Sequence, residues 1–486
     1  MRFKAVAVAA VLAAGVAGAT QAAEVSEQGA KDLFGNLTYF LPDDIAKGGA
    51  ISVKPVSSHY EVTYDLRTLF DKLDVSGFDI SGLKPLTMLA TPQDSGLWNI
   101  EGNNAFDITA HSKPGSAADM EFRYALASSN FQGVFDPALH YLRSMDMKGS
   151  GITFTTKTSD ENSGVQKNDA TVDSVGYTLS SADSGEPGRL DVKMSGSLQS
   201  LYDKISSDDT TLGEIKVAAI DFNAGATKLP LKAVNSLLHF VSEHKGQKTL
   251  SDPDATALKA LLMDAMPIAG SFEESISAKD ISVTSPFGDG GLQKLGYFFK
   301  IAGPTNAMSA DFGLNAEKLT LATGLVPEDY IAFIPDAADF QIQVPNLNFS
   351  ALMEILQQTD LNKPESDAAL DEKLQQAMFP DGTVSINFPK ISAVSGLYDI
   401  EATGSMRGWL NEKDRVSMKM TVLARDLDKT IAAVQESAKT KPDLSQLSFG
   451  LMMAKGFAKT DADGRSRWDI ELTDAGGVTV NGQVMK

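Results

Sequence analysis

The sequence contains no cysteine. This absence excludes disulfide bonds, thiolate metal sites and cysteine nucleophiles. It also fits an oxidising compartment, in which a spare thiol is a liability. The chain has 486 residues, so it is long enough to bury a large core without disulfides or a structural metal.

Basic residues are also scarce. Lys and Arg number 43 against 63 Asp and Glu, which gives a formal net charge of −20. No two Lys or Arg residues are adjacent in the chain. Binding to a phosphate backbone needs clustered positive charge, so we expect no nucleic-acid partner.

Histidine is rare, and the five histidines are scattered: His59, His111, His140, His239 and His244. The last two are five residues apart, which does not stack two ligands on one helix face as the HExxH spacing does. We interpret His239 and His244 as solvated or hydrogen-bonded histidines of a helix. The sequence therefore predicts no metal site, no cofactor and no dependence of activity on histidine.

Nucleophile motifs are missing too. There is no GxSxG elbow and no glycine-rich phosphate loop ending in GK[ST]. The pattern SxxK occurs at Ser81–Lys84 and Ser242–Lys245, without the SDN or KTG partner that penicillin-binding enzymes carry. We assign both to chance and predict no catalytic residue and no enzyme.

The segment Asp461–Gly464 partly matches the sequence motif of a calcium-binding loop. In an EF-hand register, Lys459 would occupy the first loop position and Ile470 the twelfth, and neither supplies a carboxylate. We therefore predict a hairpin turn between residues 455–459 and 468–472 in place of a calcium site.

The first 22 residues have the pattern of a secretory signal peptide. Arg2 and Lys4 precede an apolar run from Ala5 to Ala17, and small residues continue to Ala23. This pattern predicts cleavage after Ala22 or Ala23, with Ala19 as an alternative site, and a periplasmic mature protein. The alternative is an uncleaved anchor. No second apolar run approaches the length of a membrane span, so we expect no transmembrane segment after cleavage.

Alternation of apolar and polar residues dominates the rest of the chain. Residues 120–126, 308–314 and 416–422 each place apolar side chains at every second position, which is typical of antiparallel sheet with one buried face. Turn signals separate the strands, among them 148–151, 183–185, 289–291, 381–382 and 475–477. The predicted fold class is α+β, with one or more large, curved, mostly antiparallel sheets and helices on one face.

A strand followed directly by an amphipathic helix recurs four times. The predicted strand–helix units cover residues 60–73, 190–205, 340–356 and 416–434. The helical half of each has apolar residues three or four apart, which forms one stripe to bury. The repeat is divergent, and any α+β protein contains some such pairs.

Two longer helices are predicted at residues 234–241 and 258–265, with a loop between them. This loop divides the mature chain into an N-terminal sheet-rich half, residues 23–248, and a C-terminal half, residues 249–486, that carries repeated strand–helix units.

The chain holds 17 Met and 24 Phe. These residues either fill a core or line a pliable apolar groove for an acyl chain. The methionines at 418, 420, 452 and 453 fall on patterned elements.

Two segments carry a resemblance to known proteins. The chain reads YFLPDDIAKGGAISVKPVSSHYEVTYDL near its start and GGVTVNGQVM at its end. The first resembles an uncharacterised Gram-negative envelope family, domain of unknown function twenty-one twenty-five. The second resembles a closing strand common to that family and another periplasmic family, and QIQVPNLNFSALMEILQQ is similar as well. The resemblance implies an envelope location and an extended sheet-rich body. That family has no established catalytic residues, so the resemblance implies no site.

Three functions remain open on the sequence. The first is a periplasmic, non-enzymatic protein that binds or carries an apolar, lipid-like ligand in a groove between sheet and helices. The second is an envelope interaction or assembly factor that acts through protein contacts at exposed strand edges. The third is a hydrolase with paired carboxylates, which no recognisable pattern supports. The ligand-binding residues are unknown at this stage.

Overall fold

The computed structural model describes residues 25–485, except 42, 73–76, 113–118, 161–163, 209, 245, 246, 248, 322–323 and 360–366. The predicted signal peptide, residues 1–22, lies outside the described residues. The chain divides into two compact units. Unit 1 comprises Met1–Phe272 with Leu356–Pro364, and unit 2 comprises Glu273–Ile355 with Glu365–Lys486.

The sequence placed the division between residues 248 and 249, whereas unit 1 continues to Phe272. Helices α5 (Leu231–Glu243) and α6 (Asp252–Asp264) contact each other within unit 1. The chain after α6 is tied to the same unit, because the Arg189 guanidinium donates hydrogen bonds to the carbonyls of Met266 and Pro267, each at 2.8 Å. These contacts bring together residues that are nearly eighty positions apart in sequence. The sequence of the loop between the helices gives no sign of them.

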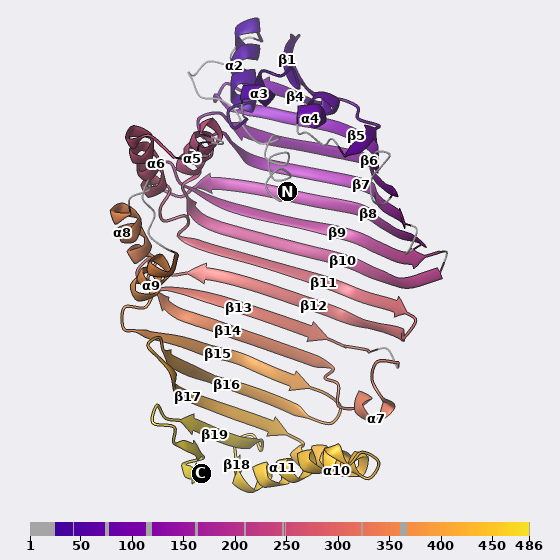
Figure 1. Cartoon of the computed structure of the whole chain (residues 1–486), viewed down its shortest axis with the longest axis vertical. Helices are drawn as coiled ribbons and strands as arrows, with labels where there is room; N and C mark the ends of the chain where they lie inside the picture. Colours follow the sequence, from indigo (N-terminus) through magenta and orange to yellow (C-terminus); the bar gives the residue numbers. More distant parts are fainter. Residues whose placement is uncertain are drawn as a thin grey trace. The chain divides into compact units, whose positions relative to one another are not determined.

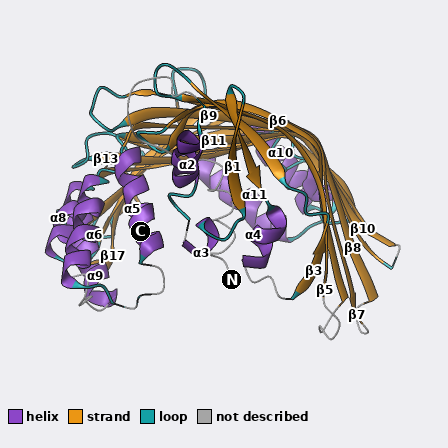
Figure 2. Cartoon of the chain, turned by 90° about the horizontal axis from the view of Figure 1, so that it is seen from above, coloured by secondary structure: helices purple, strands orange, loops and turns teal. Residues whose placement is uncertain are grey.

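Unit 1 is a mostly antiparallel sheet (Figure 1). Its hydrogen-bonded order is β1, β2, β4, β5, β6, β7, β8, β9 and β10, and β3 lies beside the far end of β5. Short hairpin turns join the long strands, which bend along their length (Figure 2). The strands are β1 (Ile51–Val56), β2 (His59–Tyr64), β3 (Phe78–Ser81), β4 (Leu86–Pro92), β5 (Trp98–Ser112), β6 (Asp119–Asp136), β7 (Tyr141–Asp160), β8 (Gly164–Asp183), β9 (Leu190–Ser207) and β10 (Thr210–Leu229).

Helix α2 (Glu27–Leu37) covers one end of this sheet. Ser26 caps the helix by accepting a hydrogen bond from the Gly29 N–H at 3.1 Å, and the Ser26 N–H donates to the Tyr60 hydroxyl at 3.0 Å. Tyr60 is fully buried beneath the helix. The main core cluster of unit 1 forms between α2 and residues of β1, β2, β4, β5, β6, β7 and β8. Two shorter helices, α3 (Asp43–Ala46) and α4 (Leu66–Lys72), flank the same region.

Unit 2 is also mostly antiparallel. Strands β12, β13, β14, β15, β16, β17, β19, β20 and β21 are hydrogen-bonded in that order, and β18 lies beside β19. The strands are β11 (Ser271–Ser285), β12 (Gly288–Ala302), β13 (Met308–Glu317), β14 (Ala337–Leu347), β15 (Thr383–Val394), β16 (Asp399–Trp409), β17 (Glu412–Arg425), β18 (Lys459–Thr460), β19 (Ser466–Leu472), β20 (Val478–Val480) and β21 (Gln483–Met485). The helices are α7 (Glu328–Ile331), α8 (Ser350–Gln358), α9 (Asp367–Met378), α10 (Leu427–Ala438) and α11 (Asp443–Phe457).

The predicted antiparallel sheet is therefore confirmed at the coarse level. Three of the four expected strand–helix junctions occur, where α4 follows β2, α8 follows β14 and α10 follows β17. The second was wrong, because residues 190–207 form the single strand β9. The turn predicted at 148–151 was also wrong, because those residues lie inside β7. Both errors have the same cause, an irregularity in the long strands that is described below.

Among the described residues, no helix combines the length and the apolar character that crossing a membrane requires.

Candidate functional site

One face of the unit 1 sheet carries apolar side chains in rows that run across the strands. Residues that lie directly opposite one another in neighbouring strands share a face of a sheet. The central row crosses six strands in register and contains Phe106, Leu126, Ile152, Val172, Leu201 and Val217. A second row, nearer α2, contains Gly102, Phe131, Met147, Tyr177, Gly196 and Phe222.

These two rows lie on the same face only because the long strands carry an extra residue. Asn104 and Phe106 are two residues apart on β5, but their partners on β6, Ser129 and Leu126, are three apart. This is the geometry of a β-bulge, which resets the alternation of side chains. The strands β6 to β10 pair in register on both sides of this point. Each of these strands therefore has the same irregularity at the matching position.

Close contacts confirm the shared face. A methyl group placed on Gly149 would lie 3.4 Å from Leu126 Cδ1 and 2.9 Å from Val175 Cγ1. Left-handed backbone at Gly151 (φ 61°) and Ser200 (φ 55°) marks the same position in β7 and β9. The spacing of three that the bulge imposes on Leu198 and Leu201 imitates a helix, which explains the wrong prediction for residues 190–205.

Part of this apolar face carries side chains that the described residues leave exposed. At one end of the face, Phe131 and Met145 pack against the core cluster under α2. Farther along, four large side chains remain substantially exposed: Tyr124 at 44%, Phe154 at 41%, Ile205 at 43% and Ile215 at 37%. We call these four residues the apolar patch. Exposed apolar groups gathered on one surface are typical of binding sites.

Asp203 and Asn168 lie among the residues of the apolar patch. Asp203 is opposite Ala170 and Ile215, and Asn168 is opposite Ile205. The Oδ1 atoms of Asp203 and Asn168 are buried and have no hydrogen-bond partner among the described residues. A buried acceptor without a donor is costly, so these two atoms are candidates for contact with a ligand.

The opposite face of the same strands is polar. It carries ion pairs between Arg123 and Asp107 at 2.7 Å, Lys167 and Asp169 at 2.6 Å, and Lys204 and Glu214 at 3.9 Å. Unit 1 thus presents a sheet with one apolar and one charged face.

Unit 2 repeats this pattern. One row in register contains Tyr297, Leu314, Phe340, Ile391, Ala402, Val422 and Trp468. Helix α11 lies against the end of this row, because the Trp468 indole N–H donates to the Ala454 carbonyl at 2.7 Å. Leu314 and Phe340 are 42% and 39% exposed. Of the methionines singled out in the sequence, 418 and 420 lie on β17, while 452 and 453 lie on α11 at 44% and 48% exposure.

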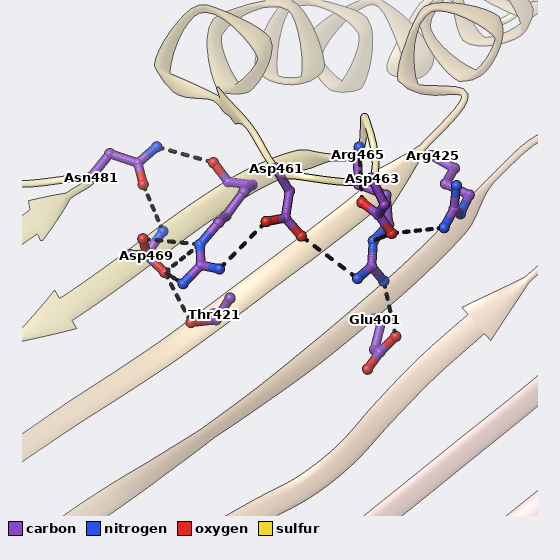
Figure 3. Close-up of polar contacts among 9 residues, drawn as sticks. Glu401, Thr421, Arg425, Asp461, Asp463, Arg465, Asp469 and Asn481 are labelled. Carbon is purple, nitrogen blue, oxygen red and sulfur yellow. Dashed lines mark hydrogen bonds and ion pairs between the residues drawn. The ribbon is translucent and has the colours of Figure 1, made fainter.

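The charged face of unit 2 holds a network of arginines and carboxylates (Figure 3). Arg465 contacts Asp463 at 2.8 Å, Glu401 at 3.2 Å and Asp461 at 3.7 Å. Its neighbour Arg467 pairs with Asp469 at 2.9 Å, and this hydrogen bond is the main reason that the pKa of Asp469 lies below its ordinary value.

This network gives the acidic residues of the segment 461–464 a structural role. They form the predicted turn, which joins β18 to β19, although the chain before β18 belongs to α11 and not to a strand. The two carboxylates of the turn neutralise arginines, which leaves them poor calcium ligands. Within the described part of the chain, no group of three or more Asp, Glu or His side chains has the geometry to hold a metal ion.

His140 meets His239 at α5, although the two histidines are 99 positions apart in sequence. The Tyr39 ring is stacked between His140, at a centroid distance of 4.2 Å, and His239, at 4.0 Å. His239 Nδ1 also lies 2.7 Å from the Tyr39 carbonyl oxygen, and His244 stacks on Phe240 at 4.0 Å. Burial, followed by the nearby His239, lowers the pKa of His140. The sequence did not predict this cluster, since its members are up to 200 positions apart.

The remaining candidate histidines and serines lie on separate elements. His59 and His111 lie on β2 and β5. Ser81 ends β3 and donates a hydrogen bond to the Thr109 carbonyl at 3.4 Å. Ser242 lies in α5, and its motif partner at position 245 is outside the described residues.

Two hollows on unit 1 differ in lining: the larger is mostly polar, whereas the smaller presents more apolar than polar surface. One of about 660 Å³ is lined by residues such as Asn99, Gln132 and Ser144, and another of about 340 Å³ lies between Arg143 and Arg189. None of the four residues of the apolar patch lines either hollow. The large apolar side chains lie instead on the open faces of the sheets.

No protein-family model, no curated protein and no solved structure matches this chain.

Proposed function

We propose that this chain is a periplasmic, non-enzymatic protein that binds or carries an apolar, lipid-like ligand on the apolar face of its sheet. One observation carries the proposal: an apolar face continues across six strands of unit 1 and ends in the exposed apolar patch, while the opposite face is charged. A lipid chain laid on this face would bury apolar side chains that water now covers, which is favourable.

The proposed architecture is a curved sheet with helices on its inner side. The bend of the long strands of unit 1 (Figure 2) and the helices that follow β2, β14 and β17 support it. The stacked bulges support it as well, because bulges bend strands and increase their twist. The periplasmic location rests on the signal-peptide pattern of residues 1–22 and on the resemblance to an envelope family.

The test uses two lysine substitutions at adjacent residues on opposite faces. Phe154→Lys places a charge in the apolar patch, and Thr155→Lys places the same charge on the polar face, where Thr155 lies opposite Arg123 and Asp169. Binding of a fluorescent fatty-acyl probe to the purified mature protein is measured by titration.

Burial of a large apolar side chain is worth about 1.5–3 kcal/mol, so we expect Phe154→Lys to weaken binding by about tenfold or more. Thr155→Lys is expected to bind like the wild type. Equal affinities for all three proteins would contradict the proposal, as would an absence of bound lipid when the periplasmic protein is examined by native mass spectrometry.

A second function, an envelope interaction factor, is favoured by helix α11. Phe449, Met452 and Met453 are 61%, 44% and 48% exposed. Met452 and Met453 follow Phe449 by three and four residues, so they lie on the same side of the helix as Phe449 and form one apolar stripe. Such a stripe is suited to a partner's groove. If this function holds, Phe449→Asp abolishes co-purification of a specific envelope protein that the wild type retains. Retention of that protein by Phe449→Asp would exclude α11 as the contact.

A further inference from the structure

We infer that the apolar patch takes a single-chain amphiphile with a protonated amine head, and that Asp203 and Asn168 bind the head. The inference rests on the proposed function, since it names the class of ligand for the same surface. It goes further by assigning two residues to the recognition of a positive charge.

The first step of the argument is position. Asp203 lies directly opposite Ala170 and Ile215, and Ala170 in turn lies opposite Phe154. Asn168 lies opposite Ile205, two residues along β9 from Asp203. Residues in such a diagonal relation are about 7–8 Å apart. A single ammonium group with three N–H donors is therefore able to reach both side chains.

The second step is the unmet hydrogen bonding. Asp203 Oδ1 and Asn168 Oδ1 are both buried, and neither has a partner among the described residues. Each is an acceptor, so a ligand that satisfies both must be a donor. A hydrogen bond to a charged group is stronger than one between neutral groups, and a carboxylate in apolar surroundings gains most from a cationic donor.

The third step is the arrangement of the lysines. Lys167 and Lys204 are the sequence neighbours of Asn168 and Asp203, but they lie on the charged face, where they pair with Asp169 and Glu214. The alternation of the strand thus turns these cations away from Asp203. The chain as a whole is acidic, with a net charge of −20, and a long-range field of this sign draws cationic ligands toward the protein.

The fourth step is the path of the chain. Tyr124, Phe154, Ile205 and Ile215 surround the two polar residues and are 37–44% exposed. The central row beneath them includes Val172 and Val217, which are 8% and 6% exposed. An alkyl chain that starts at Asp203 is able to run over this continuous apolar surface.

The experiment compares three ten-carbon probes with different heads: decylammonium, decanoate and decanol. Each is titrated below its micellar concentration into the full-length mature protein by isothermal calorimetry. We expect decylammonium to bind at least about tenfold more tightly than decanoate, because the charged hydrogen bond adds to affinity. Equal affinities, or a preference for decanoate, would overturn the inference.

Variants then locate the recognition. Asp203→Asn keeps the shape of the side chain and removes its charge, so we expect the preference for decylammonium to vanish while decanol binds as before. Asn168→Asp adds a second carboxylate and is expected to strengthen the preference. Asp146→Asn is the matched control, since Asp146 lies opposite Gln132 and Thr178 on the polar face.

The outcomes separate the two proposals. A preference for decylammonium that survives Asp203→Asn overturns the assignment of the head group but leaves apolar binding intact. Failure of the wild type to bind any of the three probes overturns the proposed function itself. Circular dichroism of each variant establishes that it is folded, and Asn168→Asp provides an independent test if Asp203→Asn does not fold.

Discussion

A buried ion pair at the end of β6 allows a quantitative test of how unit 1 is held together. Asp136 is 5% exposed. It accepts hydrogen bonds from Arg143 Nε at 2.8 Å and from the Ala138 N–H at 2.9 Å, and Arg143 Nη2 lies 2.7 Å away. Arg143 also contacts Asp183 at 2.7 Å. The pair therefore links β6, β7 and the end of β8.

The perturbation is Asp136→Asn. Asparagine keeps the size of the side chain but removes the negative charge, which leaves the half-buried Arg143 with Asp183 alone. Loss of one partner of a buried pair costs about 3–5 kcal/mol. Because Arg143 retains Asp183 and is 25% exposed, we expect the lower end, a loss of about 3 kcal/mol in the free energy of unfolding.

The control is the same substitution at an exposed pair. Asp107 binds Arg123 through two hydrogen bonds, at 2.9 and 2.7 Å, so the two pairs have similar geometry. The side chains of Asp107 and Arg123 are 54% and 48% exposed, and surface pairs contribute little to stability. We expect Asp107→Asn to leave the free energy of unfolding almost unchanged.

The assay is urea unfolding followed by tryptophan fluorescence. Trp98 lies in the core of unit 1, and a background in which Trp409 and Trp468 are replaced by Phe isolates its signal. Equal losses for Asp136→Asn and Asp107→Asn would refute the argument that burial sets the strength of the pair. An unchanged midpoint for Asp136→Asn would refute it as well.

Three further predictions concern the rest of unit 1 and metal binding. A methyl group on Gly29 would lie 2.0 Å from the Tyr60 hydroxyl, so Gly29→Ala should lower the free energy of unfolding by about 1–3 kcal/mol. In the same helix, Gly35→Ala meets nothing within 4 Å and should raise it by about 1 kcal/mol; a loss at both positions would contradict the packing of α2. The pKa of His140 is lowered by burial, so the unfolded chain takes up a proton first, and stability should fall as pH drops below about 6.5. Asparagine tolerates the left-handed backbone at this position (φ 50°), so His140→Asn should reduce the change in melting temperature between pH 7.5 and 5.5. A change as large as that of the wild type would contradict this. Treatment with a chelator should leave the melting temperature unchanged, and a drop of several degrees would reveal a metal site.

The sequence indicated the sheet because alternation is a local property. Apolar residues at every second position fix which side chains share a face in a regular strand, and β13 and β17 follow that rule. The junctions of β2 with α4 and of β17 with α10 were also predicted from the sequence. The spacing of apolar residues changes there from two to three or four, which marks a change from strand to helix.

The same reasoning failed where a strand is irregular. Leu198 and Leu201 have the spacing of a helix, but they lie in β9, where Ser200 has left-handed backbone. A single bulge is indistinguishable from the first turn of a helix when only spacing is considered. The pairing with β8 and β10 decides between them, because it satisfies the backbone of β9 along its full length.

The sequence by itself determined the composition of the two faces in each regular strand, because alternation of apolar and polar residues makes a strand amphipathic. Only the tertiary structure decided where the apolar rows join and which residues they leave exposed. It also decided that the Oδ1 atoms of Asp203 and Asn168 lie among them without a hydrogen-bond partner in the described part of the chain. It alone also brought Tyr39 between His140 and His239. The physical reason is that alternation is set by the backbone of each strand, whereas register, bulges and stacking depend on contacts between residues tens to hundreds of positions apart.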